Sequence, residues 1–536
     1  MLNLPLEPTD DRANPVFRSV ADCQRWLNQL QLTNVQLAHS KLLVQLNELN
    51  RFPMRSTERL AIMEALRETL EHVQQEVAKK LIGKPLLLSE AEFLIFMGLV
   101  HVWQGIVLGY QRCLQDYLSG DRSIAPQGAL LCQRCLLYSG LEIFEYLRTG
   151  YEFDGNLWHQ LHNLYAFTEE QDFHLTPVND TLHQRKTTCS NIYIKTLLAC
   201  DAHPSELRRS QLRLLDGWLD EWSQELELNR AYSITAGDAM PLAVDLESRD
   251  GLRLAPTVLD NDNIRYLMLI PLSKLLRVKM ILLEQGSSTE KVGLGKLPDD
   301  GEALELLTFL HKCWCESHVE RNRPSRNVGK RMEVCDQIEQ IFSELSGGAF
   351  QQPNRMITAA NREDKDDFGQ VGAPTGDKHY HAKTLEHWQV ERDSLLGGQF
   401  LRLDNAEARR LHHGQLLALR LADETSFVLG VVTSLKVTRI GRLQMGVRYL
   451  PGSPEALWVR HYGLNQLNEP HKPAFLLPAV RELNIPSSLI LPTQVFQVGK
   501  VLEMLTSKGV KATVKMQFSV ERGADYERIS FEPVRV

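Results

Sequence analysis

Two short stretches of the sequence carry side chains suited to binding an anion. The first is a cationic run, called here the basic arm (residues 321–331), which contains Arg321, Arg323, Arg326, Lys330 and Arg331. The second is a strand turn that contains Arg392, Asp393, Ser394, Gly397 and Gly398. Guanidinium groups can hold a phosphate through two hydrogen bonds, and a serine hydroxyl with glycine-exposed amides can form the opposite wall. The two stretches together indicate a site for a phosphate-bearing ligand.

Each stretch also has an interpretation that involves no ligand. The cationic run is compatible with a solvated face, and glycines at a strand turn are compatible with a hairpin that needs positive φ. Both interpretations stay open for either stretch taken alone. A shared anion site is favoured because the arm precedes, and the turn lies inside, one strand-rich region.

Other chemically capable residues lack the spacing of a site. Cys132 and Cys135 form a single CxxC, and residues 313–315 (CWC) have no second pair, whereas a structural zinc needs four ligands. We interpret these cysteines as small core residues. Residues 260–263 (DNDN) lack the glycine and the terminal glutamate of a calcium loop, and we expect a helix cap there. No P-loop, GxSxG, HExxH or dinucleotide motif occurs, so we predict no metal, no cofactor and no enzyme.

Composition sets the class of protein. The chain has 536 residues, 43% hydrophobic and 24% charged, with a net charge of −7, which is typical of a globular protein of two or three domains. The mildly acidic balance argues against binding a nucleic acid polymer. Nine cysteines without regular spacing, and an N-terminus without a signal-peptide pattern, lead us to expect a cytoplasmic protein. The apolar stretch 93–110 is slightly short for a membrane span, and we interpret it as a buried helix.

The elements that must position the site fall into two classes. Helical periodicity dominates residues 17–230, whereas short β-branched runs separated by tight turns follow residue 388, which is typical of an antiparallel meander closed into a barrel. The predicted fold class is α+β and multi-domain: an irregular helical N-terminal domain followed by a C-terminal antiparallel β-barrel. The predicted parts are a helical domain (1–232), a small hairpin about residues 250–251 plus helices continuing it (233–315), the arm and the start of the barrel domain (316–350), a flexible insertion (351–385), the barrel (386–455) and a β subdomain (456–536). The polar stretch 464–473 is expected to link two small barrels or sheets.

The strand-rich region resembles a PilZ domain, the bacterial β-barrel receptor for cyclic di-GMP. The resemblance covers roughly residues 315–455 and rests on 388–400, 427–437 and 443–450, where LQMGVRYL is similar to the family's Gly-Val strand. In that family an RxxxR motif in the arm grips the dinucleotide, and an (Asp/Asn)-x-Ser-x-x-Gly turn faces it. Ser394 and Gly397 match the turn, Arg392 stands at the Asp/Asn position, and Arg326 to Lys330 is the nearest match to RxxxR, with Arg331 next.

The resemblance implies a bacterial signalling protein that binds cyclic di-GMP and relays the signal to an unidentified protein partner through its helical domain. In the expected mechanism, two phosphates pull the arm onto the Ser394 turn, and differential binding to that arrangement shifts the equilibrium. One alternative is a ligand-free PilZ-like scaffold or adaptor in motility or pilus assembly. Another is a hydrolase hidden in the helical half, for which no catalytic constellation is visible. The partner and the oligomeric state are left open.

Overall fold

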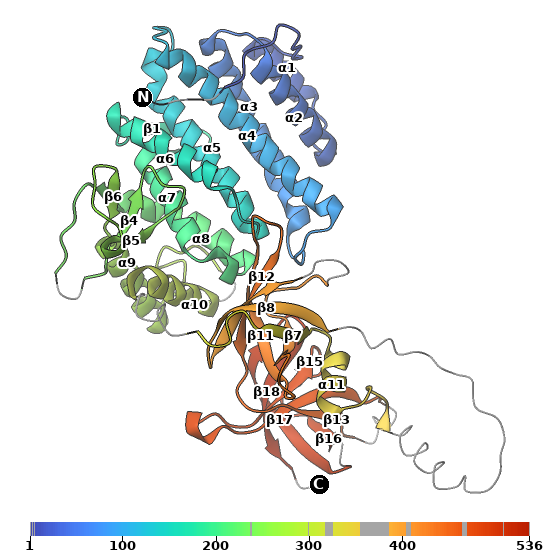
Figure 1. Ribbon diagram of the computed structural model, residues 1–536. Helices are drawn as coiled ribbons and strands as arrows, with labels where there is room; N and C mark the ends of the chain where they lie inside the picture. Colours follow the sequence, from blue (N-terminus) through green and yellow to red (C-terminus); the bar gives the residue numbers. More distant parts are fainter. Residues whose placement is uncertain are drawn as a thin grey trace. The chain divides into compact units, whose positions relative to one another are not determined.

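The chain forms two compact units (Figure 1). The computed structural model describes residues 2, 4, 6–235, 238–297, 300–316, 325–353, 385–403, 409–463, 469–506 and 509–534. The first unit, called the helical unit, comprises Met1–Lys84 and Leu88–Asn322, and the second, called the barrel unit, comprises Pro85–Leu87 and Arg323–Val536. The predicted α+β architecture, with a helical N-terminal part followed by antiparallel barrels, is confirmed.

The helical unit consists mainly of α-helices. They are α1 (Val20–Gln29), α2 (Val35–Arg51), α3 (Ser56–Ala78), α4 (Glu90–Leu118), α5 (Gly128–Thr149), α6 (Gly155–Glu170), α7 (Cys189–Asp201), α8 (Arg209–Trp222), α9 (Ile270–Glu284) and α10 (Asp300–His311). Two small antiparallel sheets accompany them: one has β1 (Val178–Asp180) and β2 (Arg185–Thr187), and the other has the order β3 (Leu228–Asn229), β6 (Ile264–Leu267), β4 (Leu242–Asp245) and β5 (Arg253–Leu254).

Two local expectations meet different outcomes in the second of these sheets. The predicted hairpin about residues 250–251 is present, because β4 pairs with β5. Residues 260–263 were expected to cap a helix, and this is wrong. They form a turn in which the Asn263 amide donates to Asn261 Oδ1 (2.8 Å) immediately before β6. An Asx side chain satisfies a nearby amide in a turn as readily as at a helix N-terminus, so the sequence alone does not separate the two.

The long helix α4 begins where its sequence predicts. The Glu92 amide donates to Ser89 Oγ and the Ser89 amide donates to Glu92 Oε2, which is a capping box. Among the described helices, α4 is the one with the length and the composition to cross a membrane, and half of its apolar window is buried. Phe96, Trp103 and Tyr110 lie in the interior, and α4 packs against α2, α3 and α5. Cys132 and Cys135 are buried thiols in α5, so their interpretation as core residues is confirmed.

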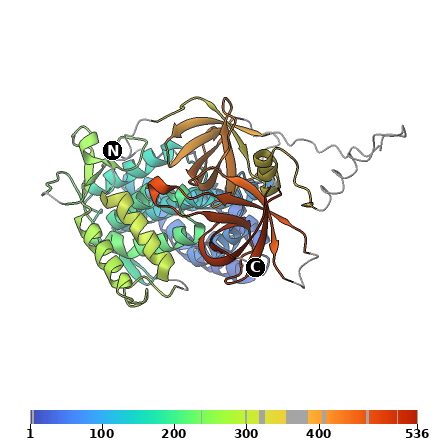
Figure 2. The same cartoon turned by 90° about the horizontal axis from the view of Figure 1, so that it is seen from below.

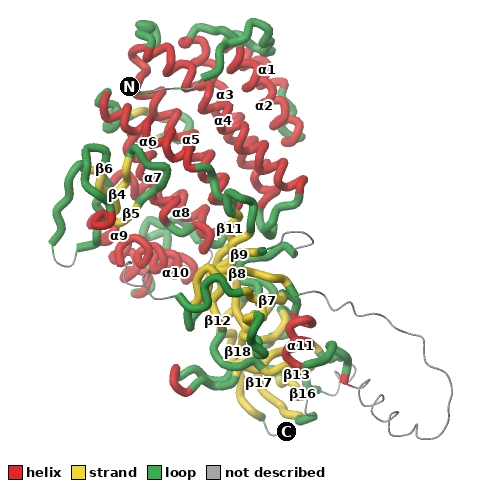
Figure 3. The backbone as a smooth tube through the Cα atoms, in the orientation of Figure 1, coloured by secondary structure: helices red, strands yellow, loops and turns green. Residues whose placement is uncertain are grey.

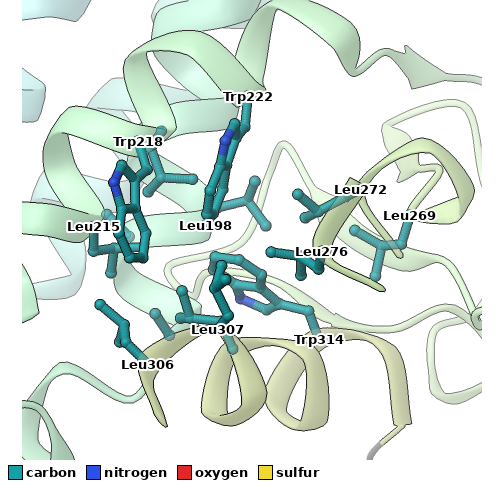
Figure 4. Packing of buried hydrophobic residues seen from close by; sticks show 14 of the residues in the cluster. Leu198, Leu215, Trp218, Trp222, Leu269, Leu272, Leu276, Leu306, Leu307 and Trp314 are labelled. Atoms are coloured by element: carbon teal, nitrogen blue, oxygen red, sulfur yellow. The ribbon is translucent and has the colours of Figure 1, made fainter. Parts of the chain in front are cut away.

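A cluster of tryptophans and leucines joins the last helices of this unit (Figure 4). Trp218 and Trp222 of α8 have ring centroids 5.4 Å apart, and Trp314, just after α10, packs in the same cluster. Leucines of α9 and α10, including Leu276 and Leu307, complete it. The helices α7, α8, α9 and α10 therefore share one core. Each buried tryptophan removes a large apolar area from water and so stabilises their packing.

A buried network of charges ties the β1–β2 hairpin to α3 and α5. Arg67 Nη2 lies 2.7 Å from Asp180 Oδ2, and Arg67 Nε donates to Tyr138 Oη (2.7 Å). His183, in the turn of the hairpin, has Nδ1 3.0 Å from Asp180 Oδ2 and Nε2 2.9 Å from Glu71 Oε2. The guanidinium and the imidazole therefore offset the buried carboxylates that surround them.

The stability of this unit should depend on the protonation of His183. Hydrogen bonds to Asp180 and Glu71 raise the pKa of His183 from 6.5 to about 9. Because the folded state binds this proton more tightly than the unfolded state, the stabilisation is fully present below about pH 6.5 and is lost as the pH rises through about 9. A His183→Asn variant should be less stable than the wild type at pH 6, and the difference should shrink by pH 10. Urea unfolding followed by circular dichroism measures it, with the exposed His101→Asn as control. A difference that does not change with pH would contradict a charged His183.

The barrel unit contains two closed six-stranded antiparallel barrels, and Figure 3 shows the change from helix to strand along the chain. The first has the order β10 (Leu416–Leu421), β11 (Val428–Val437), β12 (Leu443–Tyr449), β9 (Gly397–Arg402), β8 (Glu386–Asp393) and β7 (Arg331–Cys335). The second has the order β13 (Glu455–His461), β14 (Lys472–Leu477), β15 (Ser488–Pro492), β18 (Tyr526–Pro533), β17 (Lys511–Arg522) and β16 (Val501–Thr506), and its strands curve round one another in Figure 2.

An apolar cluster around one helix joins the two barrels. The helix α11 (Ile338–Ser346) packs against β10 of the first barrel and against β13 and β14 of the second. Phe342 of α11 and Trp458 of β13 have ring centroids 4.6 Å apart. The polar stretch 464–473 does not link the barrels as expected, because the strands on either side of it, β13 and β14, pair within the second barrel. The chain passes from the first barrel to the second between β12 and β13.

Candidate ligand site at the basic arm and the Ser394 turn

The described part of the basic arm, residues 325–331, runs beside the end of β8. The Arg326 amide donates to the Asp393 carbonyl (3.0 Å), and the Gly329 amide donates to the Val390 carbonyl (2.8 Å). At Arg331 the arm becomes β7, which pairs with β8 in the first barrel. The structure therefore brings the arm and the strand turn together, as the sequence predicted.

The cationic side chains of the arm point to solvent. Arg326, Lys330 and Arg331 are all exposed. Lys330 Nζ lies 3.1 Å from Asp423 Oδ2, whereas Arg326 and Arg331 have no ion-pair partner in the part of the chain that the structure describes. Arg321 and Arg323 lie outside the described residues. Two guanidinium groups are thus placed to receive an anion at this edge of the barrel.

A β-bulge decides which side chain of the turn faces inward. Trp388 and Val390 are buried in β8, so simple alternation would place Arg392 inside the barrel as well. The register shifts between Val390 and Arg392, and the shift leaves Arg392 exposed and Asp393 buried, with 7% of its surface accessible. Arg392 is therefore an exposed residue beside the arm.

The Asp393 carboxylate is used within the protein. Asn327 Nδ2 donates to Asp393 Oδ2 (2.8 Å), and Tyr449 Oη donates to Asp393 Oδ1 (2.9 Å). Burial, together with the neighbouring Asp393 carboxylate, raises the pKa of Tyr449 above its usual range, so the phenol stays a donor. Sequence reasoning missed Asn327 and Tyr449. The sequence did hold a signal for Asn327: an asparagine two residues before a glycine often marks a turn. Asn327 and Gly329 both adopt positive φ (54° and 81°), as these residue types often do in turns.

Ser394 and the two glycines shape the turn. Ser394 Oγ donates to the Gly397 carbonyl (2.8 Å) and accepts from the Leu396 amide (3.3 Å). Gly397 and Gly398 do not adopt positive φ, so the hairpin interpretation gives the wrong reason for them. A Cβ on Gly397 would lie 2.1 Å from the carbonyl oxygen of Val447 in β12. The glycines are required by a close approach of the chain's own backbone.

Taken together, the arrangement can bind an anion by charge and hydrogen bonding. Its exposed cations lie on the arm and at Arg392, and the turn fixes the backbone beside them. Within the described ranges, no group of three or more His, Cys, Asp or Glu side chains is placed to hold a metal ion. Exposed guanidinium groups are suited to hydrogen-bonding an anion such as a phosphate.

The fold defines a class of protein: a helical unit joined to a unit of two closed antiparallel barrels. Residues 21–232 match the family model "Cyclic-di-GMP receptor FimW, N-terminal domain", and residues 458–534 match "FimW C-terminal beta-barrel domain". The first barrel, with the arm and the Ser394 turn, lies between these two ranges. By sequence, the chain is similar to this receptor family in its helical unit and in its second barrel.

Comparison with single proteins finds one relative by sequence and one solved structure. "Cyclic-di-GMP receptor FimW" of Pseudomonas aeruginosa is 20% identical to this chain over 586 aligned positions, which cover 98% of this chain and 93% of that protein. A solved structure described as "MrkH, A novel c-di-GMP dependence transcription regulatory factor" is 9% identical and covers 40% of this chain and 91% of its own, with a TM-score of 0.13.

Proposed function

We propose that this protein is a cytoplasmic receptor for cyclic di-GMP and that the basic arm and the Ser394 turn bind the ligand. The full-length similarity to a protein described as a cyclic-di-GMP receptor supports the ligand. The observation that carries the site is that Arg326 and Arg331 are exposed, without ion-pair partners among the described residues, on an arm hydrogen-bonded to the turn. In this proposal the first barrel is PilZ-like, and the protein is an effector and not an enzyme.

Each residue has a distinct proposed role. The guanidinium forks of Arg326 and Arg331 hold the two bridging phosphates, and the exposed Arg392 adds a third cation beside the turn. Lys330 contributes a point charge and exchanges its contact with Asp423 for the ligand. Ser394, Gly397 and Gly398 set the shape of the turn. Arg321 and Arg323 belong to the same cationic run in the sequence and are proposed to add positive charge.

We further propose that the helical unit passes the signal to a protein partner. Residues 21–232 are similar to the N-terminal domain of a receptor family, which supports a role for this unit in the receptor and not only in folding. A ligand can shift a conformational equilibrium only by its difference in affinity for the two states. The relay therefore requires that cyclic di-GMP bind one arrangement of the chain more tightly than another.

Ligand binding is tested by equilibrium dialysis with labelled cyclic di-GMP. The wild type should show saturable binding, and the double variant Arg326→Ala, Arg331→Ala should bind about 100-fold or more weakly, since each charged hydrogen-bonded contact contributes about 1.5–3 kcal/mol. The matched control is Arg442→Ala, which replaces an exposed arginine immediately before β12, at the end of that strand far from the turn, and which should bind like the wild type. Absence of saturable binding by the wild type would contradict the receptor. Equal binding by the double variant would contradict the site.

A second candidate function is a ligand-free scaffold that binds another protein through the first barrel. The exposed leucines at the tip of the turn favour it: Leu395 and Leu396 are 77% and 69% accessible. The use of the Ser394 hydroxyl inside the turn also favours it, since that group is not left over for a ligand. A folded wild type that does not bind cyclic di-GMP would select the scaffold over the receptor.

A further inference from the structure

We infer that Asp393 is a positioning residue that, with Asn327 and Tyr449, anchors the basic arm to the first barrel, so that residues 325–331 form a preorganised wall of the site and not a swinging segment. This inference rests on the proposed function for its link to ligand binding. The anchoring itself is independent of any ligand. We call these three residues the arm anchor.

Asp393 holds the arm through its side chain and its main chain. Its two carboxylate oxygens accept from Asn327 Nδ2 (2.8 Å) and Tyr449 Oη (2.9 Å). Its amide donates to Ser325 Oγ (2.9 Å), and its carbonyl accepts from the Arg326 amide (3.0 Å). The carboxylate thus joins the arm to β12, the strand that ends at Tyr449, while the main chain fixes the register of the arm.

The position of Asp393 makes these bonds matter. The bulge in β8 turns its side chain inward, where 7% of the residue is accessible. A buried carboxylate is stable only when its oxygens are hydrogen-bonded, and removing it would leave the amide of Asn327 and the phenol of Tyr449 without their acceptor. The anchor is therefore an all-or-none arrangement of a few mutually dependent groups.

The conformation of the arm needs such support. Asn327 has φ of 54°, a left-handed conformation that a non-glycine residue adopts at some energetic cost. The Asp393 carboxylate accepts a hydrogen bond from the Asn327 side chain. It therefore holds the arm at the residue whose backbone conformation is unfavourable. The next residues return to the barrel edge through the Gly329 amide, which donates to the Val390 carbonyl (2.8 Å).

The anchor changes the expected mechanism. The sequence suggested an arm drawn onto the Ser394 turn by the ligand, whereas residues 325–331 are already hydrogen-bonded to the end of β8. An ordered arm lowers the conformational entropy lost on binding, so the affinity for a phosphate-bearing ligand should depend on the anchor even though Asp393 does not face the ligand.

Amide hydrogen exchange measured by mass spectrometry tests the anchor on the full chain without ligand. In the wild type the peptide covering residues 325–330 should be protected. In Asp393→Ala and in Asn327→Ala it should exchange about tenfold faster or more, because the contacts that close this segment are lost. Asp423→Ala is the matched control, since it removes an exposed carboxylate that contacts the same arm through Lys330, and it should exchange like the wild type. In Asp393→Asn the new amide oxygen can accept from Tyr449, and the new amide nitrogen can donate to the oxygen of a flipped Asn327 side chain. This variant should therefore keep most of the protection seen in the wild type.

Unchanged exchange of the arm in both alanine variants would overturn the anchor, as would faster exchange spread evenly over both barrels. If Asp393→Ala does not fold, Asn327→Ala decides the question, because Asn327 lies on the arm outside the barrel strands. The link to the ligand is tested separately: affinity for cyclic di-GMP should fall about tenfold in Asn327→Ala with the stoichiometry unchanged, because the arm must then be ordered at the moment of binding. A wild type that binds no cyclic di-GMP would contradict the proposed function while leaving the exchange result intact.

Discussion

Replacing Arg67 with alanine is expected to lower the free energy of unfolding of the helical unit by about 3–5 kcal/mol. Arg67 has 4% of its side chain accessible and lies 2.7 Å from Asp180, whose side chain is 2% accessible. It also donates to Tyr138 Oη (2.7 Å) and lies 3.3 Å from Glu64. Removing the guanidinium leaves the Asp180 carboxylate, which is itself almost fully buried, with one positive partner fewer.

The neighbouring cation does not replace Arg67. Arg134 is committed to Glu64, with Nε and Nη2 2.8 and 2.9 Å from its two oxygens, and its Nη1 reaches Asp180 only at 3.4 Å. Even Arg67→Met, which keeps most of the volume, should be strongly destabilising, because the carboxylate it leaves behind stays buried. The size of the effect therefore comes from unpaired charge and not from a cavity.

Urea unfolding of the full chain, followed by circular dichroism, measures this loss. The matched control is Arg25→Ala, which breaks an ion pair with Asp22 that is mostly open to solvent (74% of the Arg25 side chain accessible). Exposed pairs contribute about 0–1 kcal/mol, so the control should change little. An Arg67→Ala variant no less stable than the control would show that water enters the network and screens its charges.

The second large effect is expected at Gly397, where alanine should destabilise the first barrel by about 3 kcal/mol or more. The added Cβ would lie 2.1 Å from the carbonyl oxygen of Val447 and 3.1 Å from Cα of Arg448. Both atoms belong to the backbone of β12, which pairs with β9, so no side chain can turn away to make room. The two strands would have to separate at the turn that carries Ser394.

Gly348→Ala provides the comparison in the same unit. Gly348 follows α11, does not adopt positive φ and has no atom within 4 Å of the position that a Cβ would occupy. Its substitution should change stability by about 0.5 kcal/mol or less. Thermal unfolding of both variants, with near-ultraviolet circular dichroism for tertiary packing, compares them. Equal melting temperatures would mean that β9 and β12 can move apart without loss, contrary to the packing observed here.

Local sequence patterns were sufficient to predict most of the helices and strands of the fold. The capping box at Ser89 and Glu92 marked the start of α4, and alternating apolar runs after residue 388 marked the strands of the barrels. A polar stretch, however, has the same sequence pattern whether it connects two strands of one barrel or connects one barrel to another. The segment 464–473 was therefore assigned to the wrong connection, since pairing between β13 and β14 is a property of the folded chain.

The site could be predicted in outline but not in register. The proximity of the arm and the Ser394 turn followed from their places before and inside one barrel. The bulge between Val390 and Arg392 did not, and it exchanges the exposed and buried sides of the strand. The arm anchor joins residues 66 and 56 positions apart, Asn327 to Asp393 and Tyr449 to Asp393, and no local pattern encodes such contacts.

The helix α11 has a consequence for how this architecture could arise. It lies across strands of both barrels, and its Ile341 and Phe342 belong to a core that also contains Leu416 of the first barrel and Trp458 of the second. Neither barrel is thus a free module that a gene fusion could move to another protein unchanged. A chain that inherits the C-terminal barrel alone must also acquire a substitute for α11, or it will expose the tryptophan that the helix now covers.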